Sequence, residues 1–200
     1  MLGGVGGDVG LKRLLVACEF SGIVRDAFRA RGVDAVSCDL IPSERPGPHI
    51  QDDVLNHLDD GWWGMIGHPP CTHTATSGAK WFPKKQAEQK QAIEFFMRLW
   101  NAPIERVVLE QPVSIMSTAF RKPDQIIQPW EHGVAETKAT CLWIRGWPLL
   151  KPSNIVKQTT LDQRNIGRVH HEVPSPERWK NRSRTYQGIA EAMAKQWSKP

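Results

Sequence analysis

The sequence lacks the cysteine and histidine spacings that bind zinc or build a disulfide framework. Four of its 200 residues are cysteine, and none forms a Cys-x-x-Cys pair. Three of the four lie inside apolar stretches, which disfavours both a metal site and a disulfide network. His68 and His73 have no third ligand at metal spacing, so we expect no bound metal. Cys71 is the one cysteine whose setting needs a chemical explanation.

Long apolar runs are also missing. No run approaches the eighteen or so residues that a membrane-spanning helix needs. Residues 1–10 have neither the basic start nor the long apolar core of a signal peptide. We therefore expect a cytoplasmic protein without a membrane partner.

The composition is that of an ordinary globular domain, with 40% hydrophobic and 24% charged residues. The glycine-rich residues 1–12 are expected to be a disordered tail. Residues 13–200 are long enough for one domain with a full hydrophobic core, and we expect a single domain there.

The net charge of +5 is compatible with a polyanionic partner but does not require one. Positive charge concentrates near the end of the chain, close to Trp179 and Tyr186. The basic residues there are Arg164, Arg168, Arg178, Lys180, Arg182 and Arg184. Such mixing suits phosphate contacts with base stacking, and it equally suits a solvated surface.

Apolar runs alternate with helical patterns along most of the chain. Short apolar runs at residues 14–18, 35–38, 64–67, 107–109 and 139–144 predict strands. Helical spacing predicts helices over residues 23–31, 84–101 and 187–197, the second with an apolar side that includes Ala87 and Phe96. Residues 141–183 are rich in proline and show little periodicity. The order predicts an α/β fold with a doubly wound, mostly parallel sheet and helices on both faces.

Two chemically suggestive side chains follow strands of this predicted sheet. The strand at residues 64–67 leads into His68-Pro69-Pro70-Cys71, a rigid turn that presents a thiol. The strand at residues 107–109 is followed by Glu110. A thiolate and a protonatable carboxyl at neighbouring strand ends suggest covalent catalysis on an electron-poor ring.

The motif order resembles that of the DNA cytosine carbon-5 methyltransferases, in particular the short methylase-like proteins of bacteriophages. Phe20-Ser21-Gly22 resembles the family turn that binds S-adenosyl-L-methionine. Asp39 stands where the family places its ribose-binding acid, and Asp53-Val54 where it holds the adenine. Pro69-Pro70-Cys71 resembles the start of the catalytic loop, with Pro69 on the cofactor side. The resemblance implies a Rossmann-like methyltransferase fold and a methyltransferase that works in the cytoplasm, that of a bacterial host if a phage encodes it.

The resemblance also assigns residues to the target base and to DNA. Glu110-Gln111-Pro112 resembles the motif that grips cytosine, and residues 133–140 align with a segment whose two arginines are here Lys138 and Thr140. Tyr186-Gln187-Gly188 resembles the C-terminal motif that folds back beside the cofactor turn. The residues expected to contact substrate or DNA are Pro70, Ser77, Gln111, Pro112, Lys138, Thr140, Arg182 and Arg184.

The long target-recognition region of the family has little counterpart here, because only residues 141–183 separate the two last motifs. Base readout needs several side chains, each worth about 1–3 kcal/mol of discrimination. We therefore expect short or relaxed specificity, a preference for single-stranded over duplex DNA, or a partner protein that confers specificity.

In the implied mechanism, the Cys71 thiolate adds to carbon 6 of cytosine while Glu110 assists at ring nitrogen 3. Carbon 5 then attacks the sulfonium methyl group, and a base removes the carbon 5 proton to expel the thiol. This chemistry leads us to expect a raised pKa for Glu110 and a lowered pKa for Cys71.

Other interpretations remain open at this point. Cys71 can be a buried small hydrophobe, Glu110 a partner of Arg106, and the two aspartates Asp39 and Asp53 simple turn starts. An enzyme of this kind can also modify free cytosine nucleotides or transfer a variant one-carbon group. A third possibility is a non-catalytic, DNA-binding relative such as an antirestriction protein.

Overall fold

A computed structural model describes residues 12–156 and 172–199, which form one seven-stranded sheet. Its strands are β1 (Arg13–Ala17), β2 (Asp34–Asp39), β3 (His49–Gln51), β4 (Gly64–Gly67), β5 (Arg106–Pro112), β6 (Gln125–Ile127) and β7 (Thr140–Arg145). Their spatial order is β3-β2-β1-β4-β5-β7-β6. The first five strands in this order are parallel, and β7 runs antiparallel to both of its neighbours. The predicted α/β class with a mostly parallel sheet is confirmed, and the arrangement is consistent with a Rossmann-like fold.

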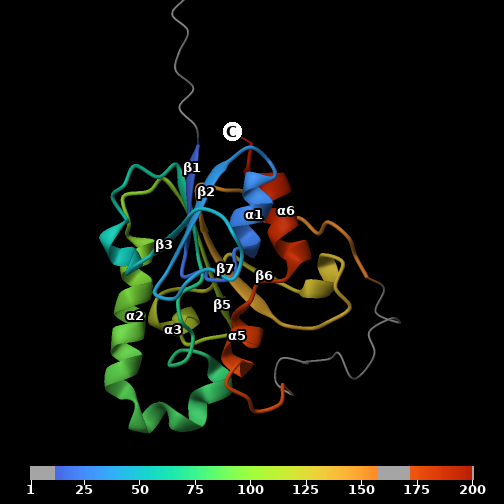
Figure 1. Ribbon diagram of the computed structural model, residues 1–200. Coiled ribbons are helices and arrows are strands. Elements are labelled where there is room, and N and C mark those ends of the chain that lie inside the picture. The colour runs from blue at the N-terminus through green and yellow to red at the C-terminus, as the bar shows by residue number, and fades with distance from the viewer. Residues whose placement is uncertain (1–11, 157–171, 200) are drawn as a thin grey trace, which may run out of the picture.

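Helices cover both faces of the sheet. The α-helices are α1 (Ile23–Arg29), α2 (Gln86–Trp100), α3 (Met116–Ala119), α5 (Arg178–Ser183) and α6 (Gln187–Trp197). Single 3₁₀ segments are η1 (Val54–Asn56), η2 (Thr76–Lys84) and η3 (Pro129–Glu131). Figure 1 shows α1 and α6 together on one face and α2 on the other. Within residues 12–156 and 172–199, no helix is both long enough and apolar enough to cross a bilayer.

The central strands are apolar on both sides because each side faces a helical layer. Successive side chains of a strand point to opposite faces. Leu14 and Val16 of β1 therefore join the core under α1 and α6, whereas Leu15 joins the core under α2. The α2 core includes Phe96 and Leu99, both fully buried. This two-sided burial explains why the strands read as continuous apolar runs in the sequence.

Some predicted boundaries are wrong for identifiable reasons. Helix α2 extends beyond the sheet at its first turns (Figure 1), so Ala87 is exposed and does not belong to an apolar side. Strand β5 continues to Pro112 because β7 pairs with it that far, which places Glu110 inside the strand. The segment 141–183 is not irregular throughout, since β7 occupies its start and α5 its end. Apart from Lys12, the predicted N-terminal tail lies outside the described residues.

Close backbone packing holds α6 against the segment that precedes β7. A Cβ atom added at Gly188 would overlap the carbonyl oxygen of His132. His132 is itself buried, and its Nδ1 lies 3.1 Å from the hydroxyl of Ser153. The glycine of the Tyr186-Gln187-Gly188 motif is therefore required for this packing.

We expect Gly188→Ala to lower the free energy of unfolding by about 1–3 kcal/mol, because the overlap forces the backbone apart. Urea unfolding measures the change. Gly78→Ala is the matched control, since the nearest atom to a Cβ there is the Thr72 carbonyl oxygen at 3.9 Å. The control should stay within about 0.5 kcal/mol of the wild type. Equal stability of both variants would contradict the packing argument.

Candidate active site

The register between β4 and β5 brings His68 and Glu110 together. Gly67 of β4 pairs with Leu109 of β5, and the two strands are parallel. The residues that follow them, His68 and Glu110, therefore lie at the same edge of the sheet. The Nδ1 atom of His68 lies 3.0 Å from Oε2 of Glu110. The two side chains are only 8% and 14% exposed. This contact joins a buried imidazole to a buried carboxylate at the carboxyl end of the sheet.

Gln111 holds the Pro-Pro-Cys turn from inside. Its amide nitrogen donates to the carbonyl oxygens of Pro69 at 3.2 Å and Pro70 at 3.4 Å. Its amide oxygen accepts from the hydroxyl of Thr74 at 3.1 Å. Gln111 is 1% exposed. The residue predicted to touch substrate thus positions the loop that carries the half-buried Cys71.

Two basic residues complete the surroundings of Cys71. The charges of Lys138 and Arg182 both lower the pKa of the Cys71 thiol, and Lys138 also lowers the pKa of Glu110. The Lys138 ammonium donates to the carbonyl oxygen of Arg182 at 3.1 Å and lies 5.7 Å from the ring centre of Tyr186. The predicted residues Cys71, Glu110, Lys138 and Arg182 therefore share one electrostatic environment.

The pKa shifts of the two central groups are opposite to the expected ones. Burial raises the pKa of Cys71, and the nearby Glu110 carboxylate raises it further. For Glu110, burial is the largest single influence and raises the pKa, but the His68 hydrogen bond and the Lys138 charge together outweigh it. The net pKa of Glu110 is lowered. At neutral pH the site therefore holds a neutral thiol beside an ionised carboxylate.

The predicted cofactor turn after β1 is internally hydrogen bonded. Glu19, which the motif did not single out, accepts from the backbone N–H of Val24 at 2.7 Å and from the hydroxyl of Ser21 at 3.2 Å. Phe20 is 6% exposed, and its ring centre lies 5.6 Å from that of Trp179 in α5. The Phe20 ring is therefore packed against α5 and has little free surface.

The two predicted acids meet beyond the ends of β1 and β2. Burial is the largest cause of the raised pKa of the Cys18 thiol, and the charges of Asp39 and Asp53 raise it further. The three side chains therefore lie close together. Burial raises the pKa of Asp39 as well. Cys18 has φ of 58°, a left-handed backbone conformation that is rare for residues other than glycine. This strained turn is a feature that sequence patterns do not reveal.

Asp53 has a structural role that can account for it without a ligand. Its carboxylate caps η1 by accepting from the backbone N–H of Leu55 at 3.0 Å. Val54, the apolar residue of the pair, is buried. The carboxylate of Asp53 nevertheless remains exposed on the same edge as Asp39.

Several residues predicted to contact DNA are placed differently. Thr140 is buried and its hydroxyl donates to the carbonyl oxygen of Lys138, so it supports Lys138 and does not reach outward. Arg184 pairs with Glu44 through two contacts, Nε to Oε2 at 2.8 Å and Nη2 to Oε1 at 2.6 Å. Ser77 is exposed in η2, while Pro70 is exposed and Pro112 half-buried. Arg164 and Arg168 lie outside the described residues.

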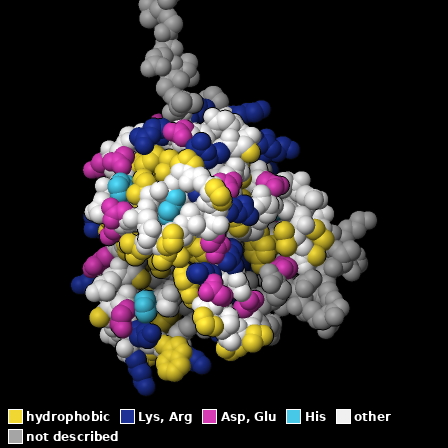
Figure 2. Space-filling model, in the orientation of Figure 1, with side chains coloured by type: hydrophobic (Ala, Val, Ile, Leu, Met, Phe, Trp, Pro, Cys, Tyr) yellow, Lys and Arg dark blue, Asp and Glu magenta, His cyan; other side chains and the backbone are white. Residues whose placement is uncertain are grey.

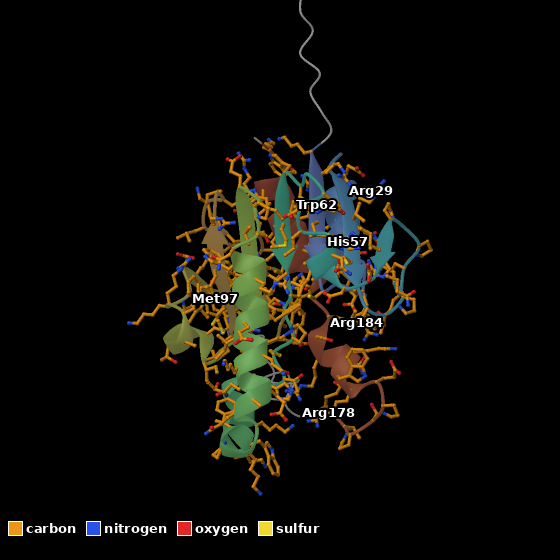
Figure 3. All side chains as sticks on the ribbon, turned by 90° about the vertical axis from the view of Figure 1, so that its left-hand side faces the viewer. Arg29, His57, Trp62, Met97, Arg178 and Arg184 are labelled. Carbon is orange, nitrogen blue, oxygen red and sulfur yellow. The ribbon has the colours of Figure 1, made fainter. Side chains whose placement is uncertain are left out.

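Basic and aromatic side chains flank the site on two elements. Trp81 of η2 is 52% exposed and Trp179 of α5 is 53% exposed. Lys80, Lys84 and Lys85 are exposed around Trp81. In Figure 2, hydrophobic and basic side chains adjoin at the lower end of the molecule, where Figure 1 places η2. Figure 3 places Arg178 toward this same end and Arg184 above it, both at α5.

Comparison with known proteins adds no identification. No protein-family model and no curated protein matches the chain. Within the described ranges, His, Cys, Asp and Glu side chains form no cluster of three or more that could hold a metal ion.

We expect Cys71 to alkylate with iodoacetamide at a rate that rises with pH and reaches half its maximum above pH 9.0, the ordinary thiol pKa, because its own pKa is raised. Glu110→Gln removes a negative charge and should lower this midpoint. Lys138→Met removes a positive charge and should raise it. Peptide mapping by mass spectrometry separates Cys71 from Cys141, whose pKa is raised by burial to about 11. Identical midpoints in all three proteins would contradict the electrostatic coupling.

Proposed function

We propose that the protein is an S-adenosyl-L-methionine-dependent DNA cytosine carbon-5 methyltransferase. The observation that carries this proposal is the convergence of Cys71 and Glu110 at adjacent parallel strand ends. The Glu110 carboxylate raises the pKa of the Cys71 thiol, which supports placing both groups at one site. A thiol and a carboxylate in this relation suit covalent attack on a pyrimidine with assistance at the ring nitrogen.

The sheet topology supports the location of a ligand site at this edge. The chain proceeds outward from β1 through β2 to β3, and then returns to place β4 and β5 on the other side of β1. Open α/β sheets bind ligands beyond the carboxyl ends of strands at such a switch in direction. The cofactor belongs on the β1 and β2 side, near Asp39. The target base belongs on the β4 and β5 side, near Cys71.

The resting protonation pattern suits addition of the thiol to the ring. Addition joins the Cys71 sulfur to carbon 6, and ring nitrogen 3 gains a proton. The neutral Cys71 thiol, beside the ionised Glu110, carries the one proton that this step needs. The site therefore takes no proton from solvent. Lys138 favours the thiolate as it forms, because its charge lowers the pKa of Cys71. S-adenosyl-L-methionine, when bound on the β1 and β2 side, would supply the methyl group for carbon 5 of the resulting enamine.

The surroundings of the site support a nucleic acid as the substrate. Exposed tryptophans beside lysines and arginines provide both base stacking and phosphate contacts. Trp81 lies on η2, which follows Cys71 in the sequence. Trp179 lies on α5, which also carries Arg182, and the charge of Arg182 lowers the pKa of Cys71. Single-stranded DNA avoids the few kcal/mol, roughly, that flipping a base out of a duplex costs.

The direct test is incubation with S-adenosyl-L-methionine and DNA, followed by mass spectrometry of the nucleosides. We expect 5-methylcytosine from the wild type and none from Cys71→Ser. Glu110→Gln should reduce the rate by about 10²- to 10⁴-fold, the usual contribution of a positioned acid–base group. Cytidine and deoxycytidine nucleotides serve as parallel substrates.

Each contrary outcome has a distinct meaning. Product from nucleotides but not from DNA would transfer the proposal to free nucleotides. A mass other than that of one methyl group would indicate a variant one-carbon donor. Binding of DNA without any product, under conditions where the donor also binds, would favour the non-catalytic relative. An active Cys71→Ser variant would refute covalent catalysis.

The basic and aromatic surface yields a separate expectation for DNA affinity. The double variant Lys84→Ala, Lys85→Ala should bind DNA more weakly. The slope of log affinity against log salt concentration should fall in magnitude by about 0.7–0.9 per lost phosphate contact. Trp81→Ala should cost about 1–3 kcal/mol of affinity for single strands if the ring stacks on a base. Lys195→Ala, an exposed change on α6, is the matched control. Fluorescence anisotropy at several salt concentrations measures all three, and equal losses in test and control variants would exclude η2 as the contact surface.

A further inference from the structure

The proposed reaction needs a base that the predicted residues do not supply. After methyl transfer, carbon 5 of the ring carries both the new methyl group and its original proton. That proton must leave before the sulfur of Cys71 can be expelled. Cys71 is bonded to the ring at this stage, and Glu110 is engaged at nitrogen 3. A further proton acceptor is therefore required close to carbon 5.

His68 carries a buried ring nitrogen that the fold leaves unused. Its Nδ1 lies 3.0 Å from Glu110, while its Nε2 is inaccessible to solvent and has no hydrogen-bond partner among the described residues. Because Glu110 is ionised, Nδ1 is the nitrogen that carries the hydrogen, which leaves a lone pair on Nε2. An unsatisfied buried polar atom costs about 1–3 kcal/mol, and a polar or acidic group of a bound substrate would remove that cost.

The position of His68 suits contact with the reacting carbon. Its backbone N–H donates to the carbonyl oxygen of Ala17 at 2.9 Å, which places it where β1 and β4 separate. Its side chain influences the pKa of Asp39 as well as that of Glu110. The imidazole therefore lies between the expected donor side and the expected base side. Carbon 5 must face the same region, since it receives the methyl group from the donor.

We propose that His68 removes the carbon 5 proton in this reaction, with Glu110 holding the imidazole in place; the inference rests on the proposed function. Nε2 takes the proton, and the electron pair of the carbon–hydrogen bond forms the double bond between carbons 5 and 6. The pair of the carbon–sulfur bond returns to Cys71 as thiolate, and the proton on ring nitrogen 3 leaves by way of Glu110 to restore the neutral thiol. The imidazolium that forms is stabilised by the Glu110 carboxylate, as in other carboxylate–histidine pairs.

DNA containing 5-fluorocytosine separates this role from a structural one. Fluorine at carbon 5 leaves no proton to remove, so the covalent complex with Cys71 forms but cannot resolve. We expect His68→Asn to form this complex at nearly the wild-type rate, because an asparagine N–H can still reach Glu110. On ordinary cytosine, the same variant should turn over about 10²- to 10⁴-fold more slowly. The covalent enzyme–DNA complex should then accumulate on unmodified DNA.

Deuterium at carbon 5 adds a second, independent measurement. Slow proton removal should give His68→Asn a larger isotope effect on turnover than the wild type has. His57→Asn is the control, since His57 also contacts carboxylates, those of Asp52 and Asp60, each at 3.0 Å. The control should keep wild-type turnover and isotope effect. Thermal unfolding with and without S-adenosyl-L-methionine establishes that both variants fold.

The outcomes distinguish this inference from the proposed function. If His68→Asn loses complex formation and turnover together, the residue is structural and the inference is overturned. Wild-type turnover in His68→Asn overturns it as well. If the wild type itself forms neither 5-methylcytosine nor the 5-fluorocytosine complex, the proposed function fails and takes this inference with it.

Discussion

The pairing of Gly67 with Leu109 is the constraint on which the candidate site depends. This register decides that His68 and Glu110 lie side by side, and it sets the starting point of the loop that carries Cys71. The Leu109 side chain fills the space beside Gly67, since a Cβ atom at Gly67 would lie 2.7 Å from Cδ2 of Leu109. A shift of one residue would turn Glu110 to the opposite face of the sheet and separate the pair. The packing of the core thus fixes the chemistry of the edge.

The reversed strand β7 brings the remaining charge to the site. Because β7 runs antiparallel to β5, its first residue, Thr140, pairs with Pro112 at the active edge. The residues just before Thr140 therefore arrive at the carboxyl ends of the parallel strands, and Lys138 is among them. Tyr186 joins the same segment through its hydroxyl, which donates to Glu136 at 2.6 Å. Two motifs that are far apart in the sequence meet here for a topological reason.

Strong periodic patterns predicted the frame of the fold, whereas short elements escaped. Residues 64–67 and 187–197 were predicted with the bounds that the structure shows, because an apolar run and a helical stripe are long enough to read. Strands β3 and β6 each have three residues, too few for any period to appear. They form because a neighbouring strand offers them hydrogen bonds, which is information about tertiary structure.

The candidate site shows the same division between local and tertiary information. The sequence pattern placed Cys71 and Glu110 at the ends of neighbouring apolar runs, and the structure places both near the carboxyl ends of β4 and β5. The expected pKa direction for Glu110 was wrong because the His68 hydrogen bond and the Lys138 charge outweigh burial. The expected direction for Cys71 was wrong because burial and the Glu110 carboxylate raise its pKa. The signal for His68 was present, as a histidine directly after a strand adjacent to that of Glu110. Gln111 was assigned to substrate, and only coordinates show that the loop occupies its amide.

The two ends of the described chain meet on the side of the sheet away from the Cys71 edge. The ammonium of Lys12, just before β1, donates to the carbonyl oxygen of Ser198, just after α6, at 3.4 Å. Parallel strands that start on that side finish at the active edge (Figure 1). A short tether between these two ends could therefore close the chain into a ring without crossing the edge that carries Cys71.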